Sequence, residues 1–287
     1  MKPGPKSEAG ARRLRRFKSR KTGFVALKTS IARTLKRPEG RAPLLAFGAH
    51  PDDIEFGCGG VIANETRAGR AAHFVICSRG EASSHGKPAQ RVAEAKKSTR
   101  LLGATVEFVE LDGDAHLEIK VAHAIKLANI IRRLQPGIVL APSLVENQHP
   151  DHPRLGQLVR EACRLARYGG VKELSTFCGS SATEDGRKLP PHAIEQLFYY
   201  AVTPEAEPPG ITPVLVDVSA PDVLRAWTSA MEAHVSQAAA RNYVELQLTR
   251  ARLHGLRAGC GHAIALFSND PLLFDSLAEA GRGARQF

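Results

Sequence analysis

Residues 44–55 read LLAFGAHPDDIE, a short apolar run that passes directly into a histidine and three carboxylates. An apolar run of this length predicts a buried β-strand, and in open α/β sheets the chemistry lies beyond the carboxyl ends of the strands. A second short apolar run, at residues 138–141, precedes the cluster His149-Pro150-Asp151-His152. We therefore expect one site, assembled from both clusters at the same edge of a sheet.

The residue types in the two clusters suit a metal ion. His50, Asp53 and His152 would supply two imidazoles and one carboxylate, which leaves at least one coordination position open, as in a catalytic zinc site. Asp52 neighbours a ligand and can take a proton from metal-bound water, while His149 can donate to an oxyanion or to a leaving amine. Either cluster alone would as readily be a helix start or a surface turn. The two together favour a metal site.

From residue 43 onward, strand-like runs alternate with segments of helical periodicity, which predicts a Rossmann-like single α/β domain with a mostly parallel sheet flanked by helices. The predicted strands are 44–49, 72–77, 106–111, 138–141, 197–202 and 213–218, and the predicted helices are 57–69, 89–102, 119–134, 153–167, 220–236 and 245–256. Residues 168–193 lack periodicity, so we expect a surface excursion near the mouth of the site. No internal repeat is apparent.

The positive charge of the chain is concentrated at its start. The net charge is +11 over 287 residues, but residues 1–41 hold 14 Lys/Arg and 2 Asp/Glu, and residues 42–287 are close to neutral. We therefore expect a flexible basic extension at 1–41 and a catalytic domain at 42–287. Residues 24–38 have the spacing of a short basic amphipathic helix that could contact an anionic surface or polymer. A solvated tail is the simpler interpretation.

Cysteine usage and hydropathy indicate a cytoplasmic protein. The five cysteines are scattered and form no C-x-x-C pair, which argues against a disulfide framework and against a thiolate zinc site. We find neither the apolar segment of a secretory signal nor a run long enough for a transmembrane helix.

Three motifs carry a family resemblance. The segments 50–55 (HPDDIE), 57–60 (GCGG) and 149–152 (HPDH) resemble the signatures of the LmbE-like, or PIG-L, zinc de-N-acetylases, and the resemblance extends from about residue 44 to about residue 273. It is closest to the bacterial branch that includes the bacillithiol-pathway deacetylases.

The resemblance implies an LmbE-like fold and removal of acetyl from an N-acetylglucosaminyl conjugate. It also implies His50, Asp53 and His152 as zinc ligands, Asp52 as general base and His149 as oxyanion or leaving-group partner. Fe²⁺ could replace Zn²⁺, because imidazole and carboxylate ligands discriminate weakly between them. A homo-oligomer is expected.

Residues that would hold the substrate are less clearly marked. Arg79 and Glu81 follow the second predicted strand, and Asp112 or Asp114 follows the third, all at the edge expected to face the substrate. His262 is a further candidate. Two departures from relatives, Gln148 before the second cluster and Ile264 where others carry Glu, bear on substrate identity.

Other functions stay open at this point. One is a metal-dependent amidohydrolase for a different N-acyl substrate. A phosphoester hydrolase would favour a second metal or an arginine clamp, and neither is evident. The third is a non-enzymatic protein that binds anionic polymers through residues 1–41, with a strongly salt-dependent affinity.

Overall fold

The computed structural model describes residues 1, 40–146, 149–174, 189–238, 242–277, 281 and 283. The predicted basic extension at 1–41 and its helix at 24–38 therefore lie almost wholly outside the described residues, as do Gln148 and the middle of the 168–193 excursion. Within the described residues, no helix is both long and apolar enough to cross a membrane.

Seven strands in the described part of the chain form one sheet, in the order β3-β2-β1-β4-β5-β7-β6. The strands are β1 (Leu44–Gly48), β2 (Ala72–Ile76), β3 (Thr105–Phe108), β4 (Ile138–Pro142), β5 (Gln196–Tyr200), β6 (Val214–Asp217) and β7 (Ala263–Ser268). Neighbours from β3 to β5 pair in parallel, whereas β7 pairs antiparallel with both β5 and β6. This confirms the predicted α/β domain with a mostly parallel sheet.

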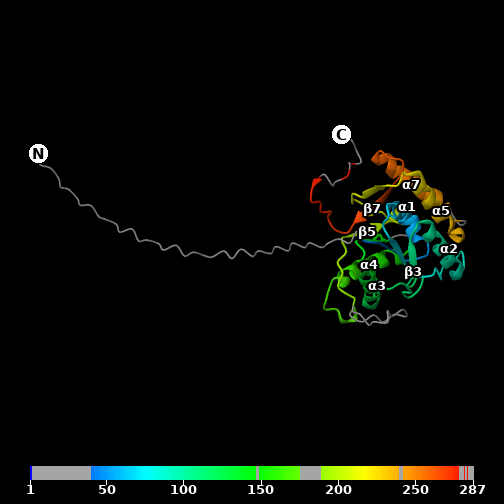
Figure 1. Cartoon of the computed structure of the whole chain (residues 1–287), viewed down its shortest axis with the longest axis horizontal. Coiled ribbons are helices and arrows are strands. Elements are labelled where there is room, and N and C mark those ends of the chain that lie inside the picture. Colours follow the sequence, from blue (N-terminus) through cyan, green and yellow to red (C-terminus); the bar gives the residue numbers. More distant parts are fainter. Residues whose placement is uncertain are drawn as a thin grey trace. The chain divides into compact units, whose positions relative to one another are not determined.

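Helices cover both faces of the sheet (Figure 1), which explains why the central strands are apolar along their whole length. On one face lie α1 (Asp53–Arg67), α2 (Pro88–Leu101), α5 (Pro221–Glu232) and α7 (Tyr243–Ala258). On the other face lie α3 (Val121–Leu134) and α4 (Asp151–Ala166). The short elements are α6 (Val235–Ala238), η1 (Lys172–Leu174) and η2 (Pro204–Ala206). Each face of the sheet buries its own apolar core.

Several boundaries differ from the prediction. Helix α1 begins at Asp53 rather than at residue 57, because its first turn carries carboxylates, which suit a helix N-terminus but show no apolar periodicity. Helix α4 begins at Asp151, so Pro153 lies within its first turn, where a missing N–H costs nothing. The helix predicted at 220–236 ends at Glu232, and the strand β7 was not predicted.

Candidate active site

The two predicted clusters meet where the order of the strands reverses. Strands β1 and β4 are neighbours, with β2 and β3 on one side and β5 on the other, so the carboxyl ends of β1 and β4 border the crevice where α/β sheets bind ligands. His50 lies in the turn between β1 and α1, and Asp53 begins α1. His152 lies in the first turn of α4. Both clusters are therefore strand-to-helix turns.

The structure brings together the three side chains that we predicted as ligands. His152 Nε2 lies 3.1 Å from Asp53 Oδ1, and His50 Nδ1 lies 3.4 Å from Asp53 Oδ2. Asp53 Oδ2 accepts the backbone N–H groups of Ala49 and His50, at 2.8 and 2.9 Å. The carboxylate is thus fixed by its own turn, and its Oδ1 atom is directed toward the second turn.

The electrostatics of this cluster favour positive charge at its centre. Burial lowers the pKa of His50, but Asp53, Asp114 and Asp151 outweigh it and raise this pKa well above its ordinary value. Burial raises the pKa of Asp53, but His152 and His50 hold it well below the ordinary range. One donor atom from each of His50, Asp53 and His152 lies within 4.8 Å of the others. Two imidazoles and a carboxylate, with buried anions around them, fit a divalent ion of the zinc or iron type.

A second group of acids lies on the other side of His50. Its Nε2 atom is 3.2 Å from Asp114 Oδ1 and 3.5 Å from Asp151 Oδ2. His149 Nε2 also approaches Asp114 Oδ1, at 3.5 Å. Metal-binding histidines commonly give their second ring N–H to a carboxylate, which fixes the tautomer and the ring orientation. Asp114 and Asp151 are placed to do this for His50, and the sequence had suggested no role for Asp151.

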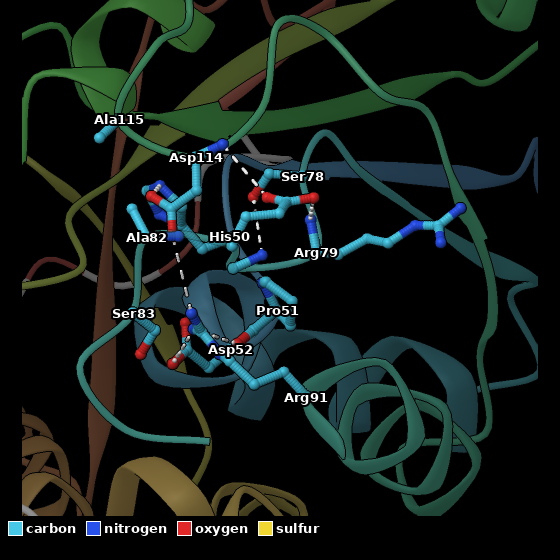
Figure 2. A network of polar contacts seen from close by, with 12 residues as sticks. His50, Pro51, Asp52, Ser78, Arg79, Ala82, Ser83, Arg91, Asp114 and Ala115 are labelled. Atoms are coloured by element: carbon cyan, nitrogen blue, oxygen red, sulfur yellow. Dashed lines mark hydrogen bonds and ion pairs between the residues drawn. The ribbon is translucent and has the colours of Figure 1, made fainter. Parts of the chain in front are cut away.

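Asp52 points to a different partner. Arg91 Nη2 donates to Asp52 Oδ2 at 3.1 Å and to the carbonyl of Pro51 at 3.0 Å (Figure 2). Burial raises the pKa of Asp52 to about 6, although Arg91 acts in the opposite direction. The backbone of Asp52 has φ 132°, a conformation that costs a non-glycine residue about 1–3 kcal/mol and persists only where the surroundings enforce it. Arg91 is part of those surroundings.

Three of the predicted substrate-binding residues, Arg79, Glu81 and His262, contact other parts of the protein. Arg79 extends away from His50 (Figure 2), with its guanidinium 2.7 Å from Glu110 and its side chain 54% exposed. Glu81 accepts the N–H groups of Arg79 and Asp114, at 3.0 and 3.2 Å, and so braces two loops. His262 donates its backbone N–H to Ser219 at 2.8 Å and lines a separate hollow beside α5 and α7.

Asp112 and Asp114 face different partners. Asp112 accepts from Lys120 Nζ at 2.9 Å, on the outer side of the loop. Asp114 is buried, faces His50 and His149, and accepts the N–H of Ala82 at 3.2 Å (Figure 2). A hollow of about 460 Å³ adjoins it, lined by Glu81, Ala82, Glu110, Asp112, Gly113, Asp114 and His116. The hollow opens beside the site and is rich in carboxylates.

Two aromatic residues that the sequence did not suggest support the first turn. The glycines of the GCGG segment make room for them, because a Cβ on Gly57 would lie 2.1 Å from the ring of Tyr200 and one on Gly59 would lie 2.7 Å from Trp227. Helix α1 is irregular at Cys58, and Trp227 Nε1 donates to the carbonyl of Glu55 at 2.7 Å. The glycines were a visible signal, but their distant partners were not.

The chain is similar to known proteins in sequence and in fold. The profile of the family described as PIG-L, GlcNAc-PI de-N-acetylase, matches residues 45–163. The chain is 29% identical over 204 residues to diacetylchitobiose deacetylase of Thermococcus kodakarensis. This match covers 68% of this chain and 69% of that protein. It is 31% identical over 160 residues to 4-oxalmesaconate hydratase of Pseudomonas putida, covering 52% of this chain and 61% of the relative.

Two further matches cover most of the protein compared. The crystal structure of the conserved protein TT1542 from Thermus thermophilus superposes with a TM-score of 0.67 at 30% identity, over 81% of this chain and 97% of that one. The uncharacterized deacetylase YaiS of Escherichia coli is 31% identical over 144 residues, which are 48% of this chain and 77% of that protein. With the HPDD and HPDH turns assembled into one cluster, these matches show that the chain belongs to the PIG-L, or LmbE-like, family.

Proposed function

We propose that this protein is a metal-dependent deacetylase that hydrolyses the N-acetyl group of an N-acetylglucosaminyl conjugate. The observation that carries the proposal is the meeting of His50, Asp53 and His152, with Asp52 beside them and held by Arg91. These three residues would hold Zn²⁺, or Fe²⁺ in its place. The ion, when bound, supplies Lewis-acid chemistry, since it polarises an acyl carbonyl and makes water more acidic.

Asp52 is the general base of the proposed reaction. One of its carboxylate oxygens, Oδ2, accepts from Arg91, and the other is left to take a proton from the attacking water. Arg91 also binds the carbonyl of Pro51, so that it fixes the turn and the carboxylate together. A base held in this way loses little orientational freedom when the reaction begins.

His149 is the proton donor of the proposed reaction. Its side chain is 32% exposed, more than the other imidazoles of the site, and its Nε2 atom lies 3.5 Å from Asp114. In its imidazolium form the ring would form an ion pair with that carboxylate. His149 in this form can stabilise the oxyanion of a tetrahedral intermediate and protonate the leaving amine.

The hydratase relative raises a second candidate function. The substrate in its name, 4-oxalmesaconate, is a carboxylate. In the hollow beside the site, Arg79 and Lys120 pair with Glu110 and Asp112, whereas Glu81 is held by backbone N–H groups. The lining carboxylates can accept hydrogen bonds from the hydroxyl and ammonium groups of an amino sugar. The nearby cations Arg79 and Lys120, which a polycarboxylate would need, are already paired, so we favour deacetylation.

The test is acetate release by the metal-loaded protein across a panel of N-acetylglucosamine conjugates, with 4-oxalmesaconate hydration measured in parallel. We expect acetate release that requires both the metal and Asp52, and no hydration. Hydration without acetate release would replace the proposal by the second candidate. Neither activity, from a protein that binds one metal tightly, would point to a different N-acyl substrate.

The cytoplasmic location, the homo-oligomer and the contact of residues 1–41 with an anionic surface or polymer remain predictions. Deleting residues 1–41 should leave acetate release unchanged, since the residues of the proposed site all lie between positions 50 and 152.

A further inference from the structure

A buried pair of ionisable residues lies behind the first turn of α1. His234 Nε2 is 3.2 Å from Glu55 Oε1, and both side chains are 0% exposed. Burial lowers the pKa of His234, but Glu55, Asp52 and Glu94 outweigh it and raise this pKa above its ordinary value.

Such a pair is not explained by stability alone. Burying an ionisable pair has a desolvation cost, and well-packed apolar residues of similar volume are often as stable or more stable. Glu55 is also not part of the proposed ligand set. Its position next to the reacting groups, between Asp53 and the irregular residue Cys58, suggests what the pair does.

Helix α5 and the residues after it hold Glu55 at two points. Trp227 Nε1 donates to the backbone carbonyl of Glu55 at 2.7 Å, and His234, seven residues later, contacts its carboxylate. The first turn of α1 is thus held by a main-chain hydrogen bond and by a side-chain ion-pair contact of one residue. Asp52 and Asp53 lie just before Glu55 in the chain, so their positions depend on this attachment.

The residues that follow α5 also contact α2, the helix that carries Arg91. Ser236 donates its N–H to Glu94 Oε1 at 3.1 Å and its hydroxyl to Glu94 Oε2 at 2.6 Å. Gln90 donates to Glu94 Oε1 at 2.9 Å, which ties the carboxylate to the start of α2. Residues 234–236 therefore contact both elements whose side chains meet at Asp52.

We infer that His234 is a positioning residue: by holding Glu55 it keeps the first turn of α1 in place, so that Asp52 stays against Arg91 and Asp53 stays against His152. As far as it concerns turnover, this inference rests on the proposed deacetylase function. It assigns His234 no contact with substrate. Its effect is on the geometry of the groups that react.

The test compares His234→Phe with His254→Phe. His254 is also buried and also contacts a glutamate, at 3.0 Å from Glu207, but in a cluster with Arg250 between α7 and η2. We expect His234→Phe to lower kcat by about 10- to 100-fold, the range typical of residues that orient metal ligands, with KM little changed. His254→Phe should lower the melting temperature without this loss of kcat. His234→Gln, which keeps a side-chain N–H for Glu55, should recover most of the lost kcat.

A spectroscopic measurement separates this inference from the proposed function. The visible absorption spectrum of the Co²⁺-loaded protein should change in His234→Phe and stay as in the wild type in His254→Phe. If the wild type releases no acetate, the proposed function fails, and the Co²⁺ spectra still decide the positioning role. Unchanged spectra together with an unchanged kcat, or a loss of kcat that His254→Phe matches, would overturn the inference. If His234→Phe does not fold, Glu55→Gln, which preserves the shape of the pair, is judged by the same criteria.

Discussion

The turns at residues 50–57 and 149–156 follow one pattern. Both read His-Pro-Asp, then a ligand candidate, then three residues and a glycine, and both connect neighbouring parallel strands to their helices. The eight-residue correspondence is short, and the structure adds to it that both segments follow neighbouring parallel strands and meet at one cluster. The residues at the fourth position, Asp53 and His152, face each other at 3.1 Å, and both belong to the proposed ligand set.

The first and third positions have exchanged their environments. In the first turn the histidine, His50, is buried among acids, and Asp52 is turned to Arg91 with φ 132°. In the second turn the histidine, His149, is only partly buried, and Asp151 is buried and accepts the N–H of Ala115 at 2.8 Å. Residues of the same type at matching positions thus have different surroundings, set by the backbone conformation and the neighbouring loops. In the proposed reaction these surroundings decide which side chain moves a proton.

Changes at the fourth position of the pattern, Asp53 or His152, should have the largest effect. Asp53→Ala or His152→Ala should weaken metal binding by more than the roughly 10- to 100-fold typical of outer-shell changes, because a ligand itself is lost. The measurement is metal content after dialysis, with affinity from competition against a chelator. Asp112→Asn is the matched control for metal content, as a nearby carboxylate that pairs with Lys120 and lies outside the proposed ligand set. One equivalent of tightly bound metal in Asp53→Ala would contradict the proposed ligand set.

At the third position of the pattern, variants should distinguish the proposed general base, Asp52, from Asp151, which orients His50. Asp52→Asn should lower kcat by about 10²- to 10⁴-fold, the usual contribution of general base catalysis, while the metal stays bound. Asp151→Asn should lower kcat less, by about 10- to 100-fold, and weaken metal binding, because it acts through His50. Steady-state kinetics and metal content on the same samples give both quantities. Equal losses of kcat with equal metal content would mean that the two aspartates do not differ as we propose.

At the first position of the pattern, the residue of the second turn, His149, should affect the reaction, and the residue of the first turn, His50, should affect metal binding. His149→Gln should lower kcat by about 10²- to 10³-fold, as does loss of an oxyanion donor, and should retain the metal. His50→Gln should lose the metal. Both variants are compared by kcat and by metal content. Loss of metal from His149→Gln would show that His149 is itself a ligand.

Some of these features could be predicted from the sequence because their signals are local. The apolar run at residues 44–48 leads almost directly into His50, Pro51 and Asp52, and the run at 138–141 precedes the second cluster by a few residues. The central strands and the residues that meet as a cluster could therefore be predicted together. Arg91 could not be assigned to Asp52, because 39 residues separate them, and Trp227 is 172 residues from the carbonyl that it binds. The starts of α1 and α4 were missed because carboxylates and a proline occupy their first turns without apolar periodicity.

The eighth position of the pattern should give the smallest effect and the sharpest contrast. A Cβ on Gly156 would lie 2.3 Å from the backbone carbonyl of Pro142, and one on Gly57 would lie 2.1 Å from the ring of Tyr200. Each glycine-to-alanine change should cost about 1–3 kcal/mol in the free energy of unfolding, as overpacking does, partly offset by about 1 kcal/mol of helix propensity.

The difference between the two glycines appears only when the neighbour is changed as well. Tyr200→Leu should relieve part of the cost of Gly57→Ala, because the clash is with a side chain, and urea unfolding of the single and double variants gives this coupling energy. No side-chain change at residue 142 can relieve Gly156→Ala, because the atom in the way belongs to the main chain. Additive effects of Gly57→Ala and Tyr200→Leu would mean that α1 moves as a whole to accept the methyl group. In that case Gly57→Ala should also lower kcat, since Asp52 and Asp53 would move with the helix.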